Sequence, residues 1–213
     1  MIRAVWLSFL VVCAGLLQGC VPVLMGAGGA MAYSTLEDRR TAGVQFDDEG
    51  IELRANNRIR ERYPDVVHVN STSYNRTVLL TGEVPDARTR EDVEKIVRAV
   101  PAVRGVSNEL EIAGISSLGA RTNDSFVTSK VKARFIDGGK FSHVHIKVVT
   151  ENGVVYLLGI VTEAEGTEAA DIARTVAGAR KVVKIFEYCK LTDEICRPRP
   201  KEPASPQKPR PAA

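Results

Sequence analysis

The sequence lacks an apolar run long enough to cross a bilayer. Its N-terminal apolar run extends from Ala4 to Leu17, and a spanning helix needs about 20 such residues, which argues against a transmembrane helix. Net charge is also small, at +3 for 213 residues. Much of the positive charge lies after Cys196, where one carboxylate, Glu202, accompanies five cations: Arg197, Arg199, Lys201, Lys208 and Arg210. The remainder is close to neutral, so overall charge does not predict nucleic-acid binding.

Signatures of catalysis and of metal binding are missing as well. Ser71, Ser73 and the aspartates show no arrangement of nucleophile and base, and no glycine-rich phosphate loop follows a strand pattern. The three histidines, His68, His143 and His145, have no third ligand at the spacing of a metal site. We therefore expect neither enzymatic activity nor a cofactor nor a metal.

Residues 1–20 have the layout of a bacterial lipoprotein signal. The apolar run has the length of a signal h-region, about 7 to 15 residues, and Gly19 places a small residue before Cys20. Cleavage there would leave a cysteine with a diacylglycerol on its thiol, and a further acyl chain on its amine would complete a stable anchor. The alternative is an ordinary secretory signal in which Cys20 is incidental. Val21 stands where bacterial lipoproteins kept in the inner membrane tend to have aspartate, and this sorting pattern implies the outer membrane, facing the periplasm, with the cell surface left open.

Cysteine is scarce, and two of the four are used at the N-terminus. Cys13 would leave with the signal and Cys20 would be acylated, so Cys189 and Cys196 remain to pair in a compartment that permits disulfides. Two free thiols are the alternative.

The segment 190–213 is rich in proline, lysine and arginine, a composition that predicts an extended, disordered tail.

An internal repeat fills the middle of the chain. Residues 77–84 reappear as 154–161, aligned through Gly82 and Gly159. A glycine within a strand pattern indicates a bulge or a close approach of another backbone. Upstream, apolar residues follow an acidic residue at the spacing of one helix face, which predicts a helix with an acidic N-cap. The matched residues are Asp48, Ile51, Ala55 and Ile59 in the first copy and Asp124, Val127, Val131 and Phe135 in the second.

Each copy reads helix, strand, strand, helix, strand, with Asn152-Gly153 as a tight hairpin turn in the second. We expect an α+β protein of two tandem domains, each αββαβ, with two helices packed on a three-stranded mixed sheet. The expected segments are a signal peptide (1–19), a lipidated tether (20–45), a first domain (46–114), a linker (115–121), a second domain (122–189) and the tail (190–213).

The hairpin at 79–84, the second helix beginning near Asp86 and the closing segment 103–108 resemble a BON domain, and residues 122–189 resemble a second one. Apart from the tail, the mature chain is similar to the dual-BON outer-membrane lipoproteins of Gram-negative bacteria. The resemblance implies a non-enzymatic protein that binds anionic phospholipids such as cardiolipin and phosphatidylglycerol through its second domain. It also implies a role in outer-membrane integrity and recruitment to the division site. The two C-terminal cysteines and the tail depart from the family pattern.

The residues of the second domain point to the same surface. Phe126, Lys130 and Arg134 follow one another at i, i+4 and i+8 beside the core stripe. The ring could enter the acyl boundary while the cations meet lipid phosphates, and Lys132 and Lys140 add positive charge nearby. The candidate phospholipid-binding residues are Ser125, Phe126, Val127, Ser129, Lys130, Lys132 and Arg134.

The first domain offers an internal comparison. Its corresponding stripe, Gly50, Arg54 and Arg58, keeps the cations without an apolar wedge, so we expect the second domain to be the binder. In one alternative, Phe126 packs in a core or between the domains and the lysines are merely solvated. In another, the protein is an interaction adaptor for envelope assembly machines, proteases or cell-wall enzymes, and lipid contact is secondary.

Overall fold

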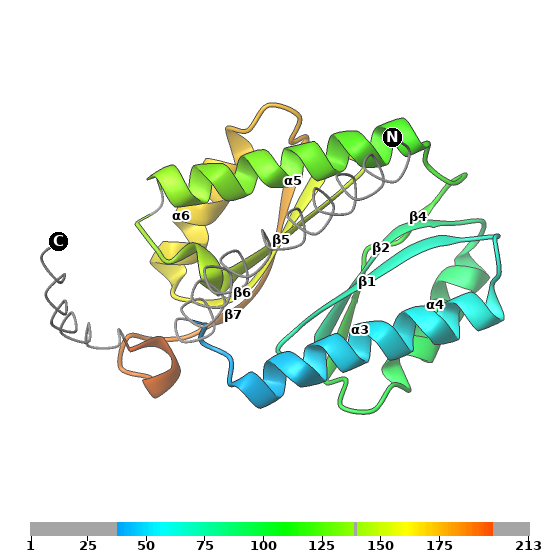
Figure 1. Ribbon diagram of the computed structural model, residues 1–213, viewed down its shortest axis with the longest axis horizontal. Coiled ribbons are helices and arrows are strands. Elements are labelled where there is room, and N and C mark those ends of the chain that lie inside the picture. The colour runs from blue at the N-terminus through cyan, green and yellow to red at the C-terminus, as the bar shows by residue number, and fades with distance from the viewer. Residues whose placement is uncertain (1–37, 139, 198–213) are drawn as a thin grey trace, which may run out of the picture.

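The computed structural model describes residues 38–138 and 140–197 (Figure 1). The expected lipid attachment site, Cys20, and the tail beyond residue 197 lie outside the described residues. The first domain consists of α3 (Ala42–Arg62), β1 (His68–Tyr74), β2 (Thr77–Val84), α4 (Ala87–Arg98), β3 (Gly105–Asn108) and β4 (Glu111–Ile112). The second consists of α5 (Leu118–Gly138), β5 (Ile146–Glu151), β6 (Val154–Val161), α6 (Glu163–Arg174) and β7 (Lys181–Tyr188). Short 3₁₀ turns lie at His143–His145 and Glu194–Cys196.

Both domains contain the predicted mixed sheet. In the first, β2 pairs antiparallel with β1 and parallel with β3, and β4 continues beside β2 after a break at residues 109–110. In the second, β6 pairs antiparallel with β5 and parallel with β7. The α+β class and the αββαβ order are confirmed.

The two strand glycines allow close approach of the neighbouring backbone, as the sequence predicted. A Cβ on Gly82, whose φ is +114°, would lie 2.0 Å from the carbonyl oxygen of His68. A Cβ on Gly159 would lie 2.5 Å from that of His145. The predicted turn at Asn152-Gly153 has φ angles of 50° and 70°, which suit a primed hairpin turn.

The prediction that Asp48 and Asp124 are helix N-caps is wrong. Both carboxylates are buried within their helices and accept hydrogen bonds from the turn of the adjacent hairpin. Asp48 accepts from the backbone nitrogens of Asn75 at 2.9 Å and Arg76 at 2.7 Å. Asp124 accepts from those of Asn152 at 2.9 Å and Gly153 at 2.8 Å. A tight turn leaves these N–H groups without a strand partner, and the carboxylate supplies one.

Both first helices begin earlier than expected. The α3 helix begins at Ala42, within the expected tether, and its N-cap hydroxyl, Thr41 Oγ1, accepts from Val44 N at 3.3 Å. The α5 helix begins at Leu118, within the expected linker, where Ser117 Oγ accepts from Ala120 N at 3.2 Å. Hydroxyl caps thus extend both helices beyond the amphipathic pattern. Of the described helices, none combines the length and apolar character needed to cross a bilayer.

The two sheets face each other and the helices cover their outer faces, so α3 and α5 lie on opposite sides of the molecule (Figure 1). Separate apolar cores fill the space between each sheet and its helices. A third cluster lies between the sheets and contains Tyr74, Leu79, Val154, Tyr156, Leu158, Ile160 and Cys196. The domains therefore share an apolar interface as well as a covalent connection.

Candidate functional site

Phe126 lies on the outer surface of α5, with 61% of the residue exposed. The Lys130 ammonium lies 4.3 Å from the centroid of its ring and also donates to the carbonyl of Ala177 at 3.1 Å. Such a cation over an aromatic face is attracted by the ring quadrupole. The alternative in which Phe126 packs in a core or between the domains is therefore wrong.

The other candidate residues divide by exposure. Ser125, Ser129, Lys132 and Arg134 are exposed, as is Lys140. The hydroxyls of Ser125 and Ser129 donate to the carbonyls of the residues four before them, at 3.1 and 3.0 Å. Val127 is 0% exposed and packs in the core of the second domain. Its inclusion among the lipid contacts was wrong, because it follows the core stripe rather than the outer one.

One apolar residue of this surface was missed. Leu118 is 78% exposed and precedes Phe126 by eight residues, so it lies two turns away on the same stripe of α5. Leu118 lies in the segment 115–121, whose small residues predict a linker. The spacing of eight residues between Leu118 and Phe126 could have indicated that they share a stripe. That spacing applies only if Leu118 belongs to the same helix, and the sequence did not predict this.

The first domain also exposes an aromatic residue, contrary to the expectation that its stripe lacks an apolar wedge. Phe46 is 74% exposed and lies four residues before Gly50, on the stripe that continues to Arg54 and Arg58. Leu53 beside this stripe is 63% exposed. The wedge was overlooked because α3 was expected to begin near Asp48.

Charge, rather than the presence of an aromatic ring, distinguishes the two helices. The α3 helix holds five carboxylates and four arginines, so its formal charge is −1: Asp47, Asp48, Glu49, Glu52 and Glu61 with Arg54, Arg58, Arg60 and Arg62. The α5 helix holds two carboxylates and four cations, so its formal charge is +2: Asp124 and Asp137 with Arg121, Lys130, Lys132 and Arg134. One carboxylate of each helix, Asp48 in α3 and Asp124 in α5, is buried against its hairpin turn. The α5 helix is thus the more positively charged of the two.

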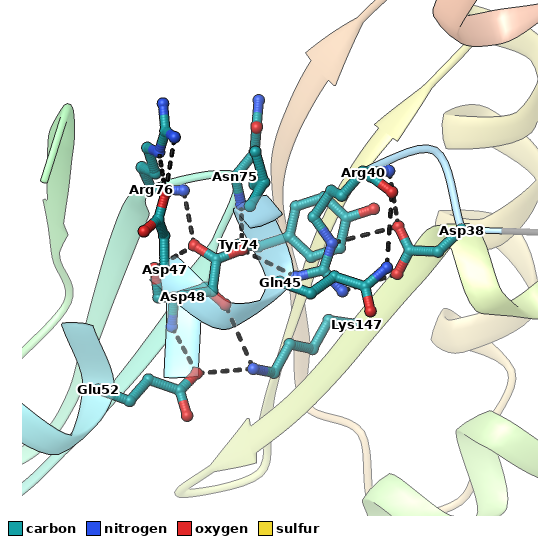
Figure 2. A network of polar contacts seen from close by, with 12 residues as sticks. Asp38, Arg40, Gln45, Asp47, Asp48, Glu52, Tyr74, Asn75, Arg76 and Lys147 are labelled. Atoms are coloured by element: carbon teal, nitrogen blue, oxygen red, sulfur yellow. Dashed lines mark hydrogen bonds and ion pairs between the residues drawn. The ribbon is translucent and has the colours of Figure 1, made fainter. Parts of the chain in front are cut away.

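A polar network joins the segment before α3 to both domains (Figure 2). Arg40 bonds to Asp38 at 2.7 Å and to Asp48 at 2.9 Å, and its guanidinium carbon lies 4.0 Å from the centroid of the Tyr74 ring. Burial raises the pKa of Tyr74, and the charge of Asp38 raises it further. Lys147 of the second domain bonds to Glu52 of the first at 2.7 Å.

The neighbouring Arg39 reaches the second domain. It donates to Glu165 at 2.7 Å and to the Ile160 carbonyl at 2.8 Å. Burial alone would raise the pKa of Glu165, but hydrogen bonds from His145 and Arg39 outweigh it and hold that pKa well below its usual range. The residues at 38–41 were expected to belong to the tether between the membrane and the first domain, yet these ion pairs fix them between the two domains.

The structure joins Cys189 and Cys196 by a disulfide, with 6.2 Å between their Cα atoms. Cys196 is 1% exposed and packs in the cluster between the two sheets. The bridge therefore holds the segment after β7 against the domain interface.

The sequence of this chain matches a protein family and several known proteins. The BON domain family model matches residues 47–114 and 123–190. The outer membrane lipoprotein DolP of Haemophilus influenzae is 38% identical over 174 residues, which cover 81% of this chain and 90% of that protein. The 21 kDa hemolysin of Actinobacillus pleuropneumoniae is 31% identical over 153 residues, which cover 71% of this chain and 79% of that protein.

Among solved structures, a match is CdsD, a structural protein of the type III secretion system of Chlamydia trachomatis. It is 14% identical, with a TM-score of 0.26, and the match covers 63% of this chain and 90% of that one. A similarity this low carries no argument about the present chain.

Proposed function

Because the chain belongs to the BON-domain family of outer-membrane lipoproteins, we propose that it binds anionic phospholipids through the outer surface of α5. In this proposal, acyl chains on Cys20 hold the protein on the periplasmic side of the outer membrane. The α5 surface then selects membrane regions rich in phosphatidylglycerol or cardiolipin, such as the division site. The protein supports membrane integrity there without catalysing a reaction.

The observation that carries the proposal is the exposed ring of Phe126 with the Lys130 ammonium 4.3 Å from its centroid. The free energy of an exposed aromatic ring is lower at the acyl boundary of a bilayer than in water. Leu118 extends the apolar contact along the same stripe. An interfacial helix needs this combination of apolar and cationic residues on adjacent positions.

Electrostatic attraction would supply only part of the affinity. Each cation near an anionic membrane contributes about 1 kcal/mol. Lys130, Lys132 and Arg134 together therefore give a weak attraction that salt reduces. Insertion of Phe126 and Leu118 would add apolar burial, which salt does not screen, and would fix the orientation of the helix.

The test compares two matched substitutions in the soluble form that carries Cys20→Ser, so that no acyl chain obscures the result. We expect Phe126→Glu to abolish sedimentation with phosphatidylglycerol vesicles, because it removes the wedge and adds a negative charge. Phe46→Glu makes the same change on α3 and should leave sedimentation unchanged. Circular dichroism checks that both variants remain folded. Equal binding by the Phe126→Glu variant and the parent protein would refute the proposal and favour the adaptor function.

A further inference from the structure

Three potential metal ligands meet where the two domains touch. His68 and Glu83 are directly opposite each other on β1 and β2 of the first domain. Glu151, at the end of β5 in the second domain, completes the group. His68 Nδ1 lies 2.9 Å from Glu83 Oε2 and 3.9 Å from Glu151 Oε1. One donor atom from each residue lies within 4.8 Å of the other two. The spacing of residues in the sequence did not predict a metal site, because these three residues come together only when the domains pack.

The two carboxylates are buried with little positive charge beside them. The exposed fractions of the Glu83 and Glu151 side chains are 1% and 9%. Within residues 38–138 and 140–197, no lysine or arginine pairs with either carboxylate, and His68 is the single ion-pair partner of both. Buried carboxylates are costly unless a cation compensates them.

Neutral donors hold both carboxylates in place. Asn70 Nδ2 donates to Glu151 Oε2 at 2.8 Å, and Thr81 Oγ1 donates to the same oxygen at 3.3 Å. Glu83 accepts from Asn152 Nδ2 at 3.3 Å and from Ser116 N at 3.2 Å. The bonds to Glu151 fall on Oε2, so its other oxygen, Oε1, lies toward His68. Outer hydrogen bonds that orient ligand oxygens in this way are typical of metal sites.

The repeat provides an internal control for this arrangement. Alignment through Gly82 and Gly159 equates His68 with His145, Glu83 with Ile160 and Glu151 with Tyr74. At that opposite end of the interface, Ile160 is 3% exposed and the Tyr74 hydroxyl donates to the His145 carbonyl at 3.1 Å. An aliphatic and an aromatic side chain close that end, so the fold itself does not require two buried carboxylates at this position.

We propose that His68 Nδ1, Glu83 and Glu151 bind a Zn²⁺ ion that clamps the two domains together. Zinc accepts one imidazole nitrogen and two carboxylate oxygens at about 2.0 to 2.2 Å in a tetrahedron, with water as the fourth ligand. Such a tetrahedron places its ligands about 3.4 Å apart, a value between the 2.9 Å and 3.9 Å that separate His68 Nδ1 from the two carboxylate oxygens. Magnesium and calcium prefer six or more oxygen ligands, so this donor set favours zinc over them.

The test uses the full acylated chain in detergent micelles, stripped of metal by a chelator and titrated calorimetrically with zinc chloride. We expect one saturable zinc ion per chain. His68→Gln and Glu151→Gln should weaken binding more than about 100-fold, because each removes a ligand rather than an outer partner, whose loss costs about 10- to 100-fold. His143→Gln is the matched control, since His143 is exposed and outside the cluster, and it should bind as the parent chain does.

A second variant separates loss of zinc from loss of folding. Glu83→Ile with Glu151→Tyr installs the residues found at the opposite end of the interface, and its circular dichroism should match that of the parent chain. Zinc should raise the melting temperature of the parent chain and of His143→Gln by preferential binding to the folded state. It should not raise that of the double variant. The absence of saturable zinc binding by the parent chain would overturn the proposal, as would equal losses in His68→Gln and His143→Gln.

Discussion

The first helices of the two domains, α3 and α5, occupy equivalent positions and use them differently. Each buries one apolar stripe in its own core, ties a buried aspartate to its hairpin turn and exposes one phenylalanine. They differ in formal charge, −1 for α3 and +2 for α5. An exposed aromatic ring is therefore common to both helices and cannot distinguish them. The charge around the ring is what we expect to decide which helix meets an anionic surface.

The largest effect expected from the comparison concerns stability. Asp48 bonds to Ser73 and Arg40 as well as to its hairpin turn, whereas Asp124 bonds only to its turn among the residues that the structure describes. Asp48→Ala should therefore lower the free energy of unfolding by about 4 kcal/mol and Asp124→Ala by about 2 kcal/mol. Urea unfolding followed by circular dichroism measures both. Equal losses would show that the additional partners of Asp48 contribute nothing.

A variant of α3 that gains membrane binding would test whether charge decides which of the two helices binds. Glu49 and Glu61 are exposed on α3, and replacing both by lysine reverses the formal charge of a helix that already exposes Phe46. At about 1 kcal/mol for each cation near the membrane, the two added lysines should make the double variant bind phosphatidylglycerol vesicles about 30-fold more tightly than the parent. An unchanged affinity would mean that α3 is unsuited to a membrane for a reason other than charge.

The smallest expected effect concerns the residue that extends the α5 surface. Leu118→Ser removes an exposed apolar side chain without changing charge. It should weaken vesicle binding about 5-fold, which corresponds to about 1 kcal/mol of partial apolar burial. Leu53→Ser is the control on α3, where a residue of the same type is 63% exposed. A similar loss in both variants would indicate contact by both helices.

The repeat, the two core stripes and the hairpin turn could be predicted because each is a local pattern with a physical period. Val127, Val131 and Phe135 recur along one helix face and are all buried. Asn152-Gly153 provides the positive φ angles of its turn. The neighbouring stripe placed Phe126 beside the core, but the sequence left open whether its ring is exposed or packs between the domains, and the structure shows it to be exposed.

The helix starts and the domain interface could not be predicted in the same way. Thr41 and Ser117 cap helices whose first turns show no amphipathic period, so Phe46 and Leu118 were not recognised as exposed helical residues. The packing of one sheet on the other brings Glu151 to His68. Nothing in the local sequence around either residue carries that information, because the contact is made only when the domains pack together.

The most direct measurement is an amide NMR titration of the Cys20→Ser form with phosphatidylglycerol micelles. We expect chemical-shift changes concentrated on residues 118–134 of α5, reduced by salt and absent from the equivalent part of α3. Shifts that are confined to α3 or to residues 198–213, or that are equal on both helices, would contradict the claim that α5 is the lipid-binding surface.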